Sequence, residues 1–85
     1  MSLTKTEMDV LNDLERNGDN VPGNIADNTG RHEKSVSRVL SQGSESLQGR
    51  GLVETKGRGV WTITEQGIKE MTRYVNGKIE EDIEK

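Results

Sequence analysis

Apolar residues recur at helical spacing on both sides of Gly30, and the rest of the chain is organised around this stretch. The apolar positions are Ile25 and Ala26 before the glycine, and Val36, Val39 and Leu40 after it. Glycine adopts a positive φ without steric cost, so Gly30 suits a tight turn between two helices. The pattern predicts a short helix from residue 22 or 23 to Thr29, and a second helix that begins at residue 32 or 33.

The preceding residues predict a first helix that ends near Asn17. Thr4 and Glu7 have the spacing of a capping box, in which each side chain accepts a hydrogen bond from the backbone of the other residue. Gly18 suits a left-handed residue that stops the helix. The core-facing positions of this helix are Met8, Leu11 and Leu14.

Three short extended segments are predicted beside the helices. Pro22 disfavours helical backbone in the residue before it, so we expect residues 20–21 to be extended and to pair with a later strand. Residues 52–56 and 60–64 are expected to form a β-hairpin, because the Gly-Arg-Gly sequence at residues 57–59 is typical of a tight turn.

The last predicted helix follows Thr64, which is placed to cap it, with Glu65 and Gln66 in the first turn. An apolar stripe continues in phase through Gly77, which predicts one long helix to about residues 81–83; a stop at Gly77 is the alternative. Such a helix extends beyond a small domain, so we expect a homodimer with a coiled-coil-like seam. The seam residues are Met71, Val75, Ile79 and Ile83.

Taken together, these segments resemble the winged helix-turn-helix DNA-binding domains of prokaryotic transcription regulators. The resemblance rests on the spacing of Ala26, Gly30 and Val36, followed by the sequences KSVSR and GLVETKGRGVWTIT. The nearest broad classes are the MarR-type and ArsR-type repressors, and more narrowly the repressor-like proteins of haloarchaea and their phages. The resemblance implies a mainly α fold with a small β-hairpin (α+β), in which residues 1–67 bind DNA and residues 68–85 form the dimerisation helix.

The chain departs from this family after Leu40, where about one helical turn is added before the next core leucine, Leu47. Because Gly43 and Leu47 keep the apolar stripe in phase, we expect the second helix of the motif to be one turn longer than usual and to end at residues 49–51. The alternative is a break at Gly43-Ser44.

Composition narrows the possible functions. The chain has 85 residues, of which 28% are hydrophobic, with no Cys and one His. We therefore expect one domain, with no disulfide and no metal centre built on thiolates or histidines. The sequence contains no phosphate-cradling loop and no acidic pair held by apolar neighbours, so we expect neither an enzyme nor a cofactor. Without a long apolar run or a signal-peptide pattern, a soluble cytoplasmic protein is expected.

Charge is distributed unevenly along the chain. The net charge is −3, which by itself argues against nucleic-acid binding. However, residues 1–30 carry −4, residues 31–63 carry +3 and residues 64–85 carry −2. Such asymmetry can steer a polyanion to one face of a protein. The acidic surplus also suits a halophilic source.

The resemblance and the positive segment together place the expected DNA contacts on the second helix of the motif and on the hairpin, or wing. Candidates for base edges are Ser35, Ser37, Arg38 and Gln42. Candidates for phosphates or the minor groove are Arg31, Lys34, Lys56 and Arg58. The alternatives are an ordinary solvated helix face and an exposed turn arginine. Alternation places Trp61 beside Ile63, so Trp61 is expected in the core rather than stacked on a base.

Two functions from different classes suit these features. The first is a sequence-specific double-stranded-DNA-binding transcription regulator of the repressor kind. The second is a winged-helix protein-protein interaction module of the transcription machinery, whose surfaces would contact protein instead. The outward-facing Lys34, Arg38 and Arg58 favour DNA.

Overall fold

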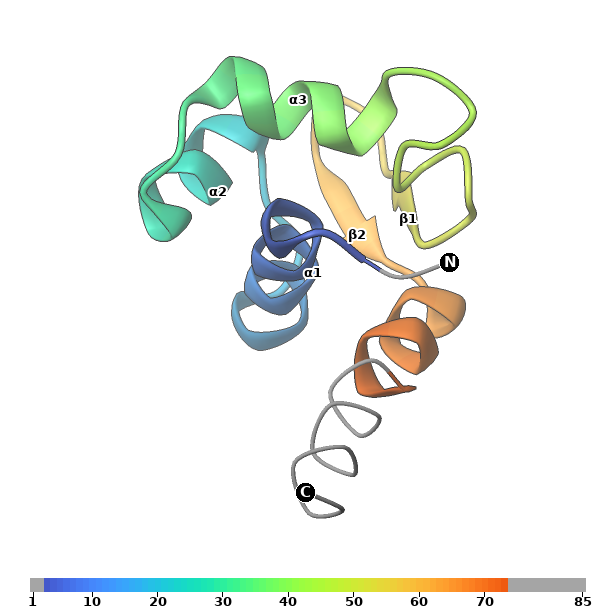
Figure 1. Ribbon diagram of the computed structural model, residues 1–85. Helices are drawn as coiled ribbons and strands as arrows, with labels where there is room; N and C mark the ends of the chain where they lie inside the picture. Colours follow the sequence, from blue (N-terminus) through green and yellow to red (C-terminus); the bar gives the residue numbers. More distant parts are fainter. Residues whose placement is uncertain (1–2, 74–85) are drawn as a thin grey trace, which may run out of the picture.

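The computed structural model of the protein describes residues 3–73, in which helices surround a two-stranded antiparallel hairpin (Figure 1). The elements are α1 (Lys5–Asn17), α2 (Pro22–Thr29), α3 (Glu33–Ser41), β1 (Val53–Thr55) and β2 (Trp61–Ile63). A further helix covers residues 65–73, the last of the described residues. The expected fold class is thereby confirmed at the level of a small α+β arrangement. None of the helices in the described part of the chain is long and apolar enough to span a membrane.

Helix α1 begins with the predicted capping box. The Thr4 N–H donates to Glu7 Oε1 over 2.9 Å, and the Glu7 N–H donates to Thr4 Oγ1 over 3.1 Å. The helix ends at Gly18, as expected, but the predicted left-handed conformation was wrong. Gly18 has φ 86° and ψ −171°, because the chain leaves α1 directly into an extended segment instead of turning back.

The predicted extension of α3 was also wrong: the helix ends at Ser41, and the alternative break is observed. Gly43 has φ 90°, outside the helical region. The loop after it folds back so that the N–H groups of Leu47 and Gln48 donate to the carbonyls of Val39 and Leu40, each over 2.9 Å. These bonds satisfy carbonyls that the end of a helix leaves without partners. Leu47 is buried by this reversal rather than by a longer helix.

The hairpin has the predicted position and turn. Val53 pairs with Ile63 and Thr55 with Trp61 in the antiparallel register. Asn20 adds a third extended segment, since it exchanges hydrogen bonds of 3.0 and 2.7 Å with the backbone of Trp61. Its expected pairing with the hairpin is confirmed.

A single apolar core joins the helices to the hairpin. It consists of Leu3, Val10, Leu11, Leu14, Ile25, Ala26, Val36, Leu40, Leu47, Leu52 and Val53. Trp61 and Ile63 are half-buried and pack against this core, as predicted from their shared face. Burial of these apolar side chains is the main term that stabilises the arrangement.

The helix over residues 65–73 is capped by Thr64 as predicted, since the Gly67 N–H donates to Thr64 Oγ1 over 3.0 Å. Gly67 packs so closely on the Leu52 carbonyl that no larger residue fits there. Met71 is half-buried against the domain's own core, whereas Ile68 is 42% exposed. The other seam residues, Val75, Ile79 and Ile83, and the question of a stop at Gly77 lie outside the described residues.

Candidate nucleic-acid interface

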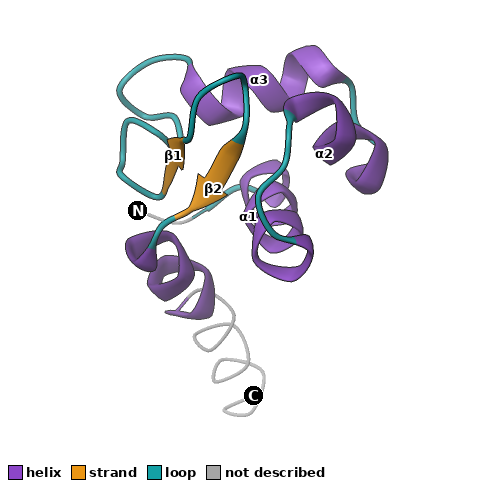
Figure 2. Ribbon diagram, turned by 180° about the vertical axis from the view of Figure 1, so that it is seen from behind, coloured by secondary structure: helices purple, strands orange, loops and turns teal. Residues whose placement is uncertain are grey.

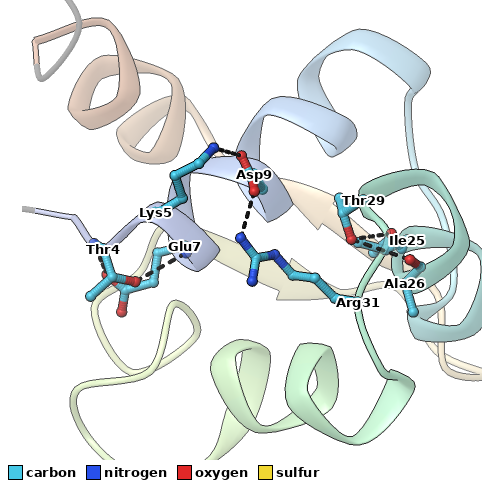
Figure 3. Close-up of polar contacts among 8 residues, drawn as sticks. All are labelled: Thr4, Lys5, Glu7, Asp9, Ile25, Ala26, Thr29 and Arg31. Carbon is cyan, nitrogen blue, oxygen red and sulfur yellow. Dashed lines mark hydrogen bonds and ion pairs between the residues drawn. The ribbon is translucent and has the colours of Figure 1, made fainter.

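The turn between α2 and α3 fixes the direction of α3. Gly30 has φ 70° and ψ 31°, the left-handed conformation that the sequence predicts there. The next N–H, of Arg31, donates to the Ala26 carbonyl over 2.9 Å. The Thr29 hydroxyl closes the end of α2 by donating to the Ile25 carbonyl over 2.7 Å (Figure 3). Glycine at the turn and these bonds together give one defined angle between the helices.

Helix α3 presents one face to the core and the other to solvent. Val36 and Leu40 are fully buried, and Val39 is half-buried against the core. The opposite face is lined by Glu33, Lys34, Ser37, Arg38, Ser41 and Gln42, which together border a shallow depression. Four predicted site residues are brought together there: Lys34, Ser37, Arg38 and Gln42. Ser35 is exposed but does not border the depression.

Glu33 and Ser41 border the depression although they were not among the predicted site residues. The helical period of the sequence predicts Ser41 on this outer face, seven residues after Lys34, and the structure places it there. Glu33 belongs to the first turn of α3, where an acid is favoured by the helix dipole. A Cβ added at Gly23 in α2 would lie 3.8 Å from the Glu33 carboxylate, so Glu33 lies close to the start of α2. No local sequence signal indicates that proximity.

Half of the cations in the positive segment form ion pairs with acids from the N-terminal segment. Arg31 pairs with Asp9 over 2.7 Å (Figure 3) and Arg50 pairs with Glu7 over 2.6 Å. Lys56 pairs with Asp19 over 2.9 Å. The first two pairs attach the segments around α3 to α1, and the third attaches the hairpin to the loop before α2. The predicted contacts of Arg31 and Lys56 with phosphate would compete with these pairs.

Two of these ion pairs shift the pKa of Asp9, Asp19 and Lys56. Hydrogen bonding by Arg31 lowers the pKa of the Asp9 carboxyl below 3.8, with a smaller contribution from Lys5. Hydrogen bonds from the Thr62 hydroxyl and from Lys56 lower the pKa of Asp19. Asp19 in turn raises the pKa of the Lys56 ammonium above 10.5. Each shift favours the charged form, so all of these groups are ionised at neutral pH.

Arg58 occupies the tip of the hairpin. It has φ 55° and stands between two glycines whose φ values are 91° and 76°. The turn is closed by the Lys56 N–H, which donates to the Val60 carbonyl over 2.8 Å. The tip lies at the same end of the molecule as α3, while the helix over residues 65–73 lies at the opposite end (Figure 2).

Three predicted cations remain available on this end of the molecule. Lys34, Arg38 and Arg58 are exposed and form no ion pair with any residue in the range 3–73. Within that range no cluster of three or more His, Cys, Asp or Glu residues could hold a metal ion. The arrangement combines cations with hydroxyl and amide groups, which suits an anionic polymer with hydrogen-bonding edges. Comparison of the chain with protein-family models, curated proteins and solved structures finds no match in any of the three.

Proposed function

We propose that the protein is a winged helix-turn-helix transcription regulator of the repressor kind that binds double-stranded DNA in a sequence-specific manner. In this proposal α2 and α3 form the helix-turn-helix and the hairpin is the wing. The observation that carries it is the outer face of α3, where Lys34 and Arg38, which form no ion pair within residues 3–73, lie among hydroxyl and amide side chains.

The dimensions of α3 suit the major groove. A helix with its side chains is about 10–12 Å across, and the groove is about 12 Å wide. Arg38 lies on the outer face of α3 and Gln42 directly follows its last residue, and both border the depression, so both are candidates for base edges. Arginine pairs with guanine and glutamine with adenine through two hydrogen bonds each. Lys34, one turn before Arg38, is placed to contact a phosphate.

The hairpin would supply a second contact. Arg58 is exposed at its tip, which lies at the same end of the molecule as α3. The Lys56–Asp19 pair attaches the turn end of the hairpin to the loop before α2. The Arg58 side chain would then contact a flanking phosphate or the minor groove, while Lys56 keeps the hairpin in position.

A dimer would double these contacts. The last helix points away from the end that carries α3 (Figure 1), so a seam formed by Met71, Val75, Ile79 and Ile83 would leave both copies of α3 accessible. Two copies of α3 would read half-sites about 34 Å apart on a near-palindromic operator.

A salt titration of binding tests this function. Fluorescence anisotropy would measure the affinity of the native protein for a random duplex at several salt concentrations. The Lys34→Ala and Arg58→Ala variants should each flatten the slope of log K against log salt by about 1, because each removes about one phosphate contact. Lys69→Ala is the matched control, since it removes an exposed cation at the opposite end of the molecule.

The competing function is the winged-helix protein-interaction module. It is favoured by Glu33 on the same depression and by the pairing of Arg31 and Lys56 with acids, both of which reduce the positive potential. If the native protein binds no duplex at low salt, or if Lys34→Ala and Arg58→Ala both keep the native slope, this function replaces DNA binding.

A further inference from the structure

The three ion pairs that join the positive segment to the N-terminal segment differ in their access to solvent. In the Lys56–Asp19 pair the two side chains are 57% and 38% exposed. In the other two pairs, which involve Arg31 and Arg50, the side chains are between 14% and 28% exposed. Water and salt screen an exposed pair more strongly than a partly buried one. The Lys56–Asp19 pair is therefore the one of the three that exchanges partners most readily.

The backbone on both sides of the Lys56–Asp19 pair is fixed. Lys56 closes the hairpin turn, since its N–H donates to the Val60 carbonyl over 2.8 Å. Asp19 directly precedes Asn20, whose backbone exchanges hydrogen bonds of 3.0 and 2.7 Å with that of Trp61. A change of partner by the Lys56 ammonium therefore requires only its flexible side chain to move.

Lys56 belongs to the same turn as the proposed wing contact, Arg58. The turn lies at the end of the molecule that carries α3 (Figure 2). Arg58 forms no ion pair within residues 3–73, whereas Lys56 Nζ lies 2.9 Å from Asp19 Oδ2. A carboxylate and a phosphate are both oxyanions that accept charge-assisted hydrogen bonds from an ammonium group. Asp19 thus occupies the Lys56 ammonium in the way that a DNA phosphate would.

We propose that Asp19 masks Lys56 from the DNA backbone and thereby limits the affinity of the wing for duplexes of any sequence. The inference rests on the proposed function, since it concerns a contact with DNA. A phosphate contact carries no sequence information, and each one raises the affinity for all duplexes. With Lys56 held by Asp19, Arg58 is the cation of the turn that is left for DNA. The pair therefore keeps sequence-independent affinity low without changing the outer face of α3.

Salt titrations of binding to a random duplex test the masking, with fluorescence anisotropy on the full chain. Asp19→Asn should raise the affinity about 2–5-fold, as expected when an exposed pair no longer competes. It should also steepen the slope of log K against log salt by about 0.9, because Lys56 then makes one further phosphate contact.

Glu54→Gln is the matched control for Asp19→Asn. It removes the same charge two residues before Lys56, and Glu54 is exposed and forms no ion pair in the described part of the chain. Glu54→Gln should keep the native slope. A slope that steepens equally in the two variants means that net charge alone is responsible, and this overturns the proposal.

Lys56→Ala assigns the effect to the masked ammonium. In the Asp19→Asn background it should flatten the slope by about 0.9, and in the native background by much less. Equal flattening in both backgrounds overturns the proposal, because Lys56 would then contact phosphate despite Asp19. If Asp19→Asn does not fold, the native background decides. There Lys56→Ala should flatten the slope by less than half as much as Arg58→Ala, and equal flattening by the two variants overturns the proposal.

The failure of this inference differs from the failure of the proposed function. If neither the native protein nor Asp19→Asn binds duplex at low salt, the proposed function fails and the masking fails with it. If native binding depends on Lys34 and Arg58 but Asp19→Asn has the native affinity and slope, the masking alone is overturned.

Discussion

The guanidinium of Arg31 donates to the carboxylate of Asp9 over 2.7 Å, which joins the entry of α3 to the middle of α1. The two residues are separated by 22 positions, so this is a tertiary contact and not a local one. Their side chains are 27% and 28% exposed. Salt therefore screens the attraction between them less than it would for a fully exposed pair. Arg31 thereby helps to hold α3 in the orientation that presents its outer face.

Replacement of Asp9 by Asn should lower the free energy of unfolding at pH 7 by about 1 kcal/mol, the upper end for a partly exposed pair. The pKa of Asp9 is lower in the folded state than its ordinary value of 3.8. The stabilisation that ionised Asp9 gives the folded state is therefore fully present above pH 3.8. It is lost as the pH falls through the folded pKa. Urea unfolding at pH 7, 4 and 2.5 should show the difference between native protein and variant shrinking toward acid pH.

Glu15→Gln is the control for this prediction, because Glu15 is an exposed acid of α1 with no ion pair among the described residues. It should leave the stability at pH 7 within about 0.5 kcal/mol of the native value. Equal losses in the two variants would mean that Asp9 acts only through the net charge of α1.

Replacement of Gly43 by Ala tests where α3 ends. In the structure Gly43 has φ 90°, so a Cβ there should cost about 1–2 kcal/mol of stability. If α3 instead continued through this position, the same change would add about 1 kcal/mol, because Ala is the better helix former. The sign of the change in urea midpoint therefore decides whether α3 ends before Gly43 or continues through it. Ser44→Ala, an exposed change with no such constraint, serves as the control.

Two glycines show how far local sequence determines the fold. At Gly30 the glycine itself marks the turn between two short helices, and the sequence correctly predicts a positive φ there. At Gly43 the stripe keeps its phase to Leu47, which predicts a continuing helix, yet the chain reverses there. Leu47 would be buried by a longer helix and is buried by the reversal. Hydrogen bonds from the returning loop to the end of α3 favour the reversal, and these bonds leave no trace in apolar periodicity.

The candidate site was predictable to a similar extent. Val36 and Leu40 determine which face of α3 is buried, and this fixes the outer positions of Lys34 and Arg38. The pairing of Arg31 with Asp9 was not predictable, because ion pairs between distant segments depend on how the elements pack. A count of charge by segment consequently overstates the positive potential of the face.

The seam on the last helix yields a separate prediction. Ile79→Asp should convert a dimer into a monomer, because a carboxylate would be placed within the predicted apolar stripe. Lys78→Asp changes a neighbouring residue outside the stripe and should leave the dimer intact. Sedimentation equilibrium would measure the mass of each. A native protein that sediments as a monomer excludes the predicted dimer, and an Ile79→Asp variant that sediments as a dimer places the seam elsewhere.

Arg38→Ala should affect sequence preference rather than general affinity. The guanidinium is exposed on the outer face of α3 and forms no ion pair within the described residues, so its removal leaves no buried group unsatisfied. If Arg38 pairs with a guanine, the variant should lose about 1–3 kcal/mol on a selected operator and should no longer discriminate at one base pair. Selection of binding sites from a random library with native and variant proteins would measure this, with Lys34→Ala as the matched control. Lys34→Ala should weaken binding to all duplexes while the selected sequence stays unchanged. The same selected sequence for native protein and Arg38→Ala would exclude a base contact by this residue.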